Sequence, residues 1–173
     1  EGRPASFVIP SGNLGNALAC VWARHVGLPI GEIVLAHNAN RTVPDFLSGL
    51  PWQPRRSIAT LASAMDVGDP SNMERLRALY PGLPALQSAV TAEVVDDAAI
   101  RERIAAADAA YGRIWCPHTA IAAEVMARMP EARRRSAASA TSPPTGPPSA
   151  RRWTTSPGCS SSRRRGACRP SRS

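Results

Sequence analysis

The segment VIPSGNLGNAL, residues 8–18, holds the residues with the clearest capacity for chemistry. Its pattern predicts an apolar strand, a short loop with two glycines and two asparagines, and then a helix. Gly12 and Gly15 allow conformations and close approaches that a Cβ atom would block. Exposed N–H groups at the start of a helix attract anions, and the helix dipole adds to this attraction. The loop therefore predicts a phosphate site to which Asn13 and Asn16 add amide donors, although glycines in such turns also serve purely structural roles.

Several other residue types could do chemistry, but each has a simpler structural interpretation. Ser11 lacks the G-x-S-x-G pattern of a hydrolase nucleophile. Cys116 is either a nucleophile or a small buried thiol. Asp66 is expected to cap a turn or to accept hydrogen bonds from backbone N–H groups. These alternatives leave the loop at residues 12–16 as the strongest candidate site.

The three histidines also have competing interpretations. His118 follows Pro117 at the predicted start of a helix, where a capping or packing role competes with a catalytic one. His25 and His37 are expected to be surface or loop residues. None of the three is therefore assigned a chemical role from the sequence.

The elements that would position these residues alternate between strand and helix. Strands are predicted at residues 6–9, 32–36, 92–95 and 114–116. Helices are predicted at residues 13–25, 42–47 and 117–129. Two more helices are expected, one from a capping box at 71–74 to Pro81 and one from Asp96 to Gly112. Strand, helix and strand at the first of these spacings form a βαβ unit with parallel strands. The fold class is therefore predicted to be α/β with a parallel sheet.

Length and composition narrow the class further. The 173 residues are enough for one domain with a sizeable core. No apolar run is long enough to cross a membrane, and no leader is expected because the sequence shows no charged and then apolar N-terminal segment. The four cysteines have neither metal-ligand spacing nor the density of a secreted scaffold. A cytoplasmic protein without a metal site is the expectation.

The net charge of +8 is concentrated at one end of the chain. Residues 1–131 contain 11 Arg and 13 acidic residues, whereas residues 132–173 contain 10 Arg and no acidic residue. The second segment consists largely of Ser, Pro, Arg and Ala and contains no Leu, Ile, Val or Phe. We therefore expect an α/β domain over 1–131 and a disordered tail over 132–173 that lacks contact with the sheet.

Three interpretations of this tail remain open. A frameshift near residues 129–133 would convert GC-rich codons into Arg, Pro, Ser, Ala and Gly, and this interpretation is favoured. The tail could instead be a solvated terminus. It could also be a basic arm that contacts nucleic-acid phosphates.

Four segments of the sequence resemble threonine synthases and occur in the order that this family has them. They are VIPSGNLGNALACVWARHVGLPIGEIVLAHNANRTVPDFL, TLASAMDVGDPSNMERL, VVDDAAIRERI and CPHTAIAAEV. Together they cover about residues 5 to 129. The resemblance implies an incomplete, Rossmann-like cofactor domain of a fold type II enzyme that uses pyridoxal 5'-phosphate.

The resemblance also implies a reaction and a set of cofactor residues. The enzyme would convert O-phosphohomoserine and water to L-threonine and phosphate. The residues that match the family's cofactor-phosphate loop are Gly12, Asn13, Leu14, Gly15 and Asn16. The two asparagines favour threonine synthases over relatives such as the serine and threonine dehydratases, whose loops are richer in glycine.

The sequence departs from the family in two ways. The family has a Schiff-base lysine upstream of the phosphate loop, and this sequence contains no lysine at all. A TAHPAKF-like segment should follow the helix at 117–129, where the Arg-rich tail stands instead. We therefore expect a C-terminal fragment that is inactive by itself.

Two alternatives remain beside a threonine synthase, whose oligomeric state the sequence leaves open. One is another pyridoxal-phosphate enzyme of the β- or γ-elimination or replacement type, such as a dehydratase. The other is a nucleic-acid-binding protein that uses the basic tail, although the slightly acidic residues 1–131 argue against it.

Overall fold

The computed structural model describes residues 4–134 and 137–139. The strands are β1 (Ala5–Pro10), β2 (Ile30–His37), β3 (Thr91–Val94) and β4 (Ala137–Ser139). The helices are α1 (Gly15–His25), α2 (Thr42–Leu47), α3 (Met73–Leu79), α4 (Leu83–Ala89), α5 (Asp97–Tyr111), α6 (Pro117–Arg128) and α7 (Glu131–Arg134), with a 3-10 turn at Ser63–Met65. Strand and helix alternate along most of this order, which confirms the α/β class.

The four described strands form one parallel sheet in the order β3-β2-β1-β4. β1 and β2 pair from Ala5 with Ile30 to Pro10 with Ala36, which confirms the parallel strands predicted for the first βαβ unit. β2 continues the ladder to β3, where His37 pairs with Val94. The carboxyl ends of β1 and β2 therefore lie side by side, and this edge is where ligands bind in open α/β sheets.

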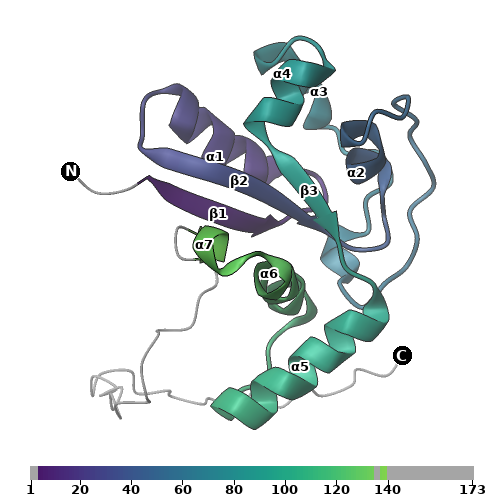
Figure 1. The fold of residues 1–173 in the computed structure, drawn as a ribbon. Coiled ribbons are helices and arrows are strands. Elements are labelled where there is room, and N and C mark those ends of the chain that lie inside the picture. Colours follow the sequence, from purple (N-terminus) through teal and green to yellow (C-terminus); the bar gives the residue numbers. More distant parts are fainter. Residues whose placement is uncertain (1–3, 135–136, 140–173) are drawn as a thin grey trace, which may run out of the picture. The chain divides into compact units, whose positions relative to one another are not determined.

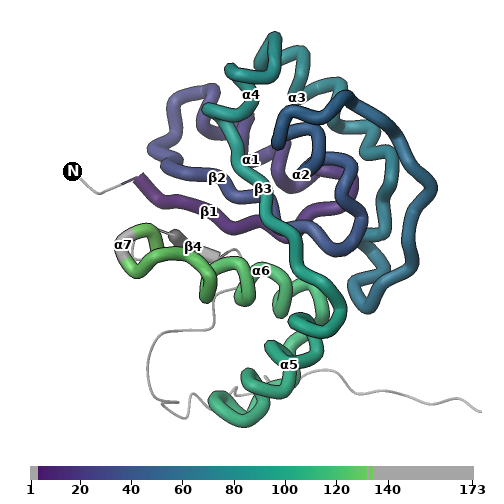
Figure 2. The backbone as a smooth tube through the Cα atoms, turned by 45° about the vertical axis from the view of Figure 1, so that its right-hand side comes forward, coloured from purple at the N-terminus to yellow at the C-terminus, as the bar shows by residue number. Residues whose placement is uncertain are grey.

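Helices cover both faces of the sheet (Figures 1 and 2). Ile33 and Leu35 of β2 pack with residues of α1 to α4 on one face, whereas Val34 and Ala36 pack with α5 and α6 on the other. Alternation along the strand produces this division, because successive side chains point to opposite faces. Burial on both faces explains why β2 reads as a nearly continuous apolar run.

The helices α5 and α6 are joined to each other and to the sheet by polar contacts. Glu124 of α6 accepts hydrogen bonds from Arg103 of α5 at 2.5 Å and from Arg128 at 2.9 Å. Burial by itself would raise the pKa of the Glu124 carboxyl. The two arginines outweigh this effect and lower the pKa below its usual range. Arg128 also donates to the carbonyl oxygen of Val94 at the end of β3. The two helices are thereby linked to each other and to the end of β3.

Several predicted elements agree with the structure and others differ from it. The helix at 42–47 and the helix between Asp96 and Gly112 are confirmed, with Gly112 at a φ of 59°. α1 begins two residues later than predicted, because Leu14 adopts a left-handed conformation before it. The strand predicted at 114–116 is absent from the described residues, and Ile114 is 80% exposed.

Two further corrections concern the segment around α3. The predicted capping box is wrong, because α3 begins at Met73 after Asn72 and has no side-chain cap. The hydroxyl of Ser71 instead donates to Asn13 Oδ1 at 3.1 Å. A further helix, α4, was not predicted from the sequence, and it packs Leu86 and Ala89 into the core.

The boundary expected between residues 131 and 132 falls inside α7. Residues 137–139 form β4, which pairs with β1 from Ser6 opposite Ala137 to Val8 opposite Ser139. Arg133 also forms an ion pair with Glu32 of β2. The expectation that the chain lacks contact with the sheet from residue 132 on is therefore wrong for these residues. For residues 140–173, which lie outside the described residues, disorder and frameshift stay predictions.

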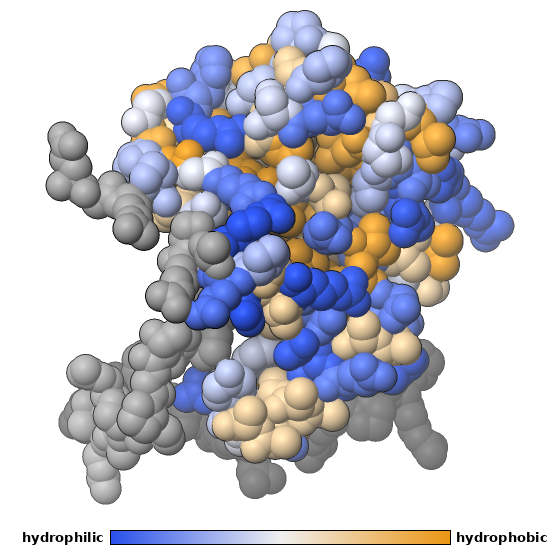
Figure 3. All heavy atoms as spheres, viewed as in Figure 1, coloured by the Kyte–Doolittle hydropathy of each residue, from blue (hydrophilic) through white to orange (hydrophobic). Residues whose placement is uncertain are grey.

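The surface of the described part is mixed in character. Its most exposed large hydrophobic residues are Val26, Tyr111 and Ile114. On the face shown in Figure 3, hydrophobic areas alternate with hydrophilic residues. No helix among residues 4–134 is long and apolar enough to cross a membrane.

The cap of α5 provides a test of the local structure. Asp96 accepts a hydrogen bond from the backbone N–H of Ala99 at 2.8 Å. We expect Asp96→Ala to lower the free energy of unfolding by about 1 kcal/mol, because an N–H group at the helix start loses its partner. Asp108→Ala, within the same helix, is the control and should leave stability unchanged or slightly higher. Urea unfolding of both variants measures the difference, and equal stabilities would show that the cap contributes nothing.

Candidate anion site at the carboxyl edge of the sheet

The loop at residues 11–16 leaves the end of β1 and enters α1 within a few residues. The N–H of Ser11 extends the ladder by donating to the carbonyl oxygen of Ala36 at 3.1 Å. Leu14 then turns the chain with a φ of 62° while its side chain is fully buried in the core. A left-handed residue lets the chain reverse from strand to helix in so few residues. Burial of Leu14 thus anchors the middle of the loop.

Asn16 holds the loop in this shape from within. Its Oδ1 accepts hydrogen bonds from the Ser11 hydroxyl at 2.7 Å and from the N–H of Ala17 at 2.9 Å. Its Nδ2 donates to the carbonyl oxygen of Pro10 at 2.8 Å. The Asn16 amide therefore joins the end of β1 to the first turn of α1, and it acts as a positioning group more than as a free donor.

The backbone N–H groups of the loop are available to a ligand. The N–H groups of residues 12 to 16 donate to no acceptor within the part of the chain that the structure describes. The first N–H groups of a helix have no partner in their own helix, and here the loop adds others. Five consecutive donors at the positive end of an 11-residue helix make this loop the candidate anion site.

The far side of the loop is backed by two other segments. A Cβ atom on Gly12 would lie 2.7 Å from the Cα atom of Met65, so only glycine fits there without a shift of the backbone. Next along the loop, Asn13 accepts hydrogen bonds from Ser71 at its side chain and from Asn72 Nδ2 at its carbonyl oxygen. The loop is therefore supported by the 3-10 turn and by the segment before α3.

A buried polar network fixes that 3-10 turn. Asn38, at the end of β2, donates from Nδ2 to Asp66 Oδ1 at 2.7 Å and to Thr60 Oγ1 at 2.8 Å. Asp66 also accepts hydrogen bonds from the hydroxyl and the N–H of Thr60. Asn40 exchanges hydrogen bonds with the backbone of Ile58 at 2.8 Å and 2.9 Å. These bonds tie residues 58–66 to the carboxyl end of β2.

Only one member of this network, Asp66, was predicted from the sequence to accept hydrogen bonds. Asp66 accepts a backbone N–H as predicted, but its main partners are side chains. Asn38, Asn40 and Thr60 were not singled out. The available signal was two asparagines directly after a buried strand, a position at the ligand-binding edge of a parallel sheet.

The remaining candidates lie apart from this loop or have structural roles. Ser11 is buried and its hydroxyl donates to Asn16, which leaves a structural role. Cys116 is exposed, not buried, and its Sγ lies 3.2 Å from the Thr119 hydroxyl. Hydrogen bonds from Thr119 and the helix start lower the pKa of the Cys116 thiol, although burial opposes them. His118 is half-buried in the first turn of α6, and its Nε2 has no partner among the described residues.

His25 and His37 differ from each other. His25 is exposed, as expected. His37 was expected at the surface or in a loop, but it ends β2 and is only 4% exposed. Burial lowers its pKa from 6.5 to about 4, and its Nε2 has no hydrogen-bond partner among the described residues. His37 is therefore held in its neutral form.

Gly12 allows a direct test of the packing behind the loop. Gly12→Ala should lower the free energy of unfolding by about 1–3 kcal/mol, because the added Cβ meets the Met65 backbone. Gly15→Ala is the matched control, since its Cβ would lie 3.7 Å from the nearest atom, Asn72 Nδ2. Urea unfolding should separate the two variants. Equal stabilities would show that the 3-10 turn does not press on Gly12.

Burial of His37 predicts a dependence of stability on pH. The unfolded chain takes up a proton on this residue near the ordinary value of 6.5, but the folded chain does so only near 4. The stability that comes from keeping His37 neutral should therefore be fully present above the ordinary pKa. The free energy of unfolding should fall as the pH drops between these values, by about 2 kcal/mol from pH 7 to pH 5.

The measurement compares urea unfolding at the two pH values in two variants. His37→Leu should remove most of this pH dependence, whereas His25→Leu, which changes an exposed histidine, should retain it. An unchanged pH dependence in His37→Leu would contradict the assignment to His37.

Comparisons with known proteins place this geometry in context. No family model matches the chain. A threonine synthase of Serratia marcescens is 39% identical over 118 residues, which is 66% of this chain and 26% of that protein. The crystal structure of threonine synthase from Escherichia coli matches with a TM-score of 0.66 and 31% identity, over 75% of this chain and 30% of that one. The chain thus spans about a quarter of the length of the curated relatives that it matches.

A second solved structure supports the same fold. The structure of PLP-bound threonine synthase from Brucella melitensis has a TM-score of 0.71 at 24% identity, over 82% of this chain and 36% of that one. Both kinds of comparison agree with the resemblance in the sequence. By sequence and fold, the chain therefore belongs with the threonine synthases, as a fragment that matches part of their length.

Proposed function

We propose that the loop of Gly12, Asn13, Leu14, Gly15 and Asn16 binds the phosphate group of pyridoxal 5'-phosphate. The observation that carries this proposal is the run of five backbone N–H groups without an acceptor among the described residues, at the start of α1. A phosphate presents several acceptor oxygens and negative charge, and such a run of donors suits both.

The residues fit this group in three respects. The close approach of the loop to Met65 at Gly12 leaves the other side of the loop for a ligand. Asn16 orients the loop through bonds to Ser11, Ala17 and Pro10. The Oδ1 of Asn13 accepts a hydrogen bond from Ser71, which leaves its Nδ2 as an additional donor. Asn13 is thus the side chain that we assign to phosphate contact, and Asn16 is a positioning residue.

The reaction that we propose for the whole protein is that of a threonine synthase. It converts O-phosphohomoserine and water to L-threonine and phosphate. When bound, pyridoxal phosphate supplies an electron sink for carbanion chemistry on an amino-acid substrate. The share contributed by this chain is binding and orientation: its N–H groups hold the phosphate, and the buried network behind the 3-10 turn keeps the loop in place.

We assign covalent attachment of the cofactor to no side chain of this sequence. The sequence contains no lysine, so we expect the chain by itself to bind the cofactor without a lysine Schiff base and to form no threonine. We place the whole enzyme in the cytoplasm, with a small-molecule substrate, and leave its oligomeric state open.

The other candidate functions have less support. The curated relatives include threonine synthases from several bacteria and yeast, which favours this activity over that of a dehydratase. The nucleic-acid arm depends on residues 140–173, which lie outside the described residues. The described residues carry no observation in favour of either alternative.

Binding of phosphate esters by the full chain tests the site. We expect pyridoxal 5'-phosphate to bind and to shift the amide resonances of residues 12–16 in NMR spectra, because their N–H groups contact the phosphate. Pyridoxal, which lacks the phosphate, should bind at least about tenfold more weakly, since charge-assisted hydrogen bonds are lost.

A conservative variant makes the test specific. Asn13→Asp keeps the acceptor for Ser71 but adds a negative charge, and it should weaken binding by at least about tenfold. Gln53→Glu adds the same charge at an exposed position of the loop after α2 and should bind normally. Normal binding by Asn13→Asp, or shifts confined to other residues, would refute the assignment of the phosphate to this loop.

A further inference from the structure

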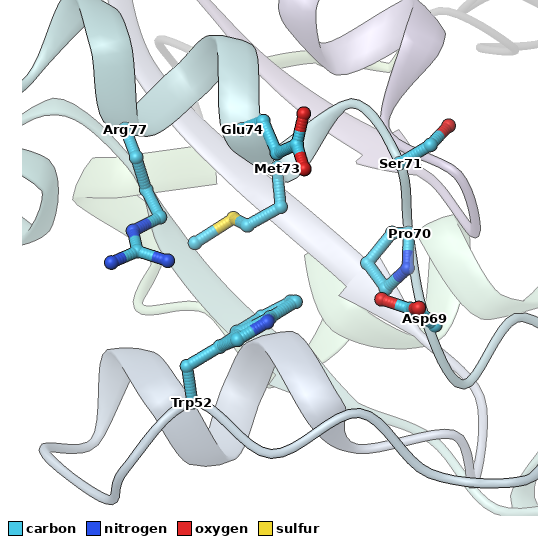
Figure 4. Close-up of a pocket in the computed structure, with 7 residues that line it drawn as sticks. All are labelled: Trp52, Asp69, Pro70, Ser71, Met73, Glu74 and Arg77. Carbon is cyan, nitrogen blue, oxygen red and sulfur yellow. The ribbon is translucent and has the colours of Figure 1, made fainter.

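A second opening lies between the loop after α2 and the start of α3 (Figure 4). It is a cavity of about 170 Å³, lined by Trp52, Asp69, Pro70, Ser71, Met73, Glu74 and Arg77. Pockets for drug-sized ligands measure ~300–1,000 Å³, so this cavity suits a ligand of few non-hydrogen atoms.

An apolar wall is held in place on one side of this cavity. The ring of Trp52 packs edge to face on Phe46, with centroids 5.5 Å apart. The guanidinium of Arg77 lies over the ring of Phe46, 5.6 Å from its centroid. Met73 is only 2% exposed and adds its thioether to the lining. The indole and the thioether thus offer an ordered apolar surface to a ligand.

Three charged groups around the cavity have no partner of opposite charge. Among the described residues, Asp69, Glu74 and Arg77 form no ion pair and no side-chain hydrogen bond. In the view of Figure 4, the guanidinium and the Asp69 carboxylate lie at opposite ends of the opening, with Met73 and Trp52 between them. The cavity therefore combines an anionic end, a cationic end and an apolar wall.

We propose that this cavity binds a free, apolar α-amino acid as its zwitterion. The ammonium group would be held by Asp69 and Glu74 beside the indole face of Trp52, which itself attracts cations. The carboxylate would accept hydrogen bonds from the guanidinium of Arg77, whose planar group suits carboxylates. The apolar side chain would lie against Trp52 and Met73.

Other ligand classes match this set of groups less well. Two carboxylates oppose a phosphate or a nucleotide. A simple amine would leave the guanidinium without a partner, and a simple carboxylic acid would leave both carboxylates without one. No group of three potential metal ligands occurs among residues 4–134, which argues against a cation site of that kind.

The proposal is independent of the phosphate loop, although the two sites are neighbours. Ser71 lines the cavity and donates a hydrogen bond to Asn13 of the loop. Binding is therefore measured without pyridoxal phosphate or inorganic phosphate present. Failure of one site then says nothing about the other.

Titration of the full chain with L-valine tests the proposal. We expect weak saturable binding that shifts the indole resonance of Trp52, identified by its loss in Trp52→Phe. Isobutylamine lacks the carboxylate of valine and isovalerate lacks its ammonium group. Each should bind at least about tenfold more weakly than valine, because one charged end of the cavity then has no ligand group of opposite charge to bind.

Charge-neutralising variants identify the two ends of the site. Glu74→Gln and Arg77→Gln should each weaken valine binding by about tenfold or more. Glu74→Gln should do so at an unchanged melting temperature, whereas Arg77→Gln also loses the contact with the Phe46 ring and should melt slightly lower. Glu102→Gln and Arg101→Gln make the same changes on the exposed surface of α5 and should bind as the parent does. Absence of a Trp52 shift, equal binding of isobutylamine, or normal binding by Glu74→Gln would each overturn the proposal.

Discussion

The polar contacts of Asn38 are the interaction on which the candidate site depends. Asn38 is 1% exposed, and its amide joins the end of β2 to Asp66 and Thr60. A buried amide that loses such partners costs about 1–3 kcal/mol, so the network favours one position of the segment at residues 58–66. That segment ends in the 3-10 turn against which Gly12 packs, and this contact constrains the shape of the loop at residues 11–16.

The rest of the loop is held by packing against the core and by the Asn16 side chain. Leu14 enters the core shared by α1 to α4, while the amide of Asn16 closes the loop on Pro10 and Ser11. The loop is thus held at Gly12, Leu14 and Asn16, and its backbone donors are left between these anchors. A candidate anion site built in this way is held in shape by the protein itself, which would reduce the entropic cost of binding.

Local patterns predicted the elements that depend on residues close in sequence. The helix at Thr42–Leu47 and the capped helix α5 agree with their predicted limits. Several of the failures occur where distant segments compete. Ser71 was expected to cap α3, but Asn13 lies close enough to take its hydroxyl. His37 was expected near the surface, but at the end of β2 it is only 4% exposed. The short strand β4 depends entirely on the presence of β1 beside it.

The sequence by itself determined which donor groups the loop contains and the class of the fold. Glycines, asparagines and an apolar alternation act through neighbouring residues, so their consequences can be read locally. Only the tertiary structure decided what surrounds the loop. The partners of Gly12 and Asn13 lie more than 50 residues away at Met65, Ser71 and Asn72, and the pairing of Asn38 with Asp66 spans 28 residues. Contacts of this kind form when the chain packs, and no local preference of the residues encodes them.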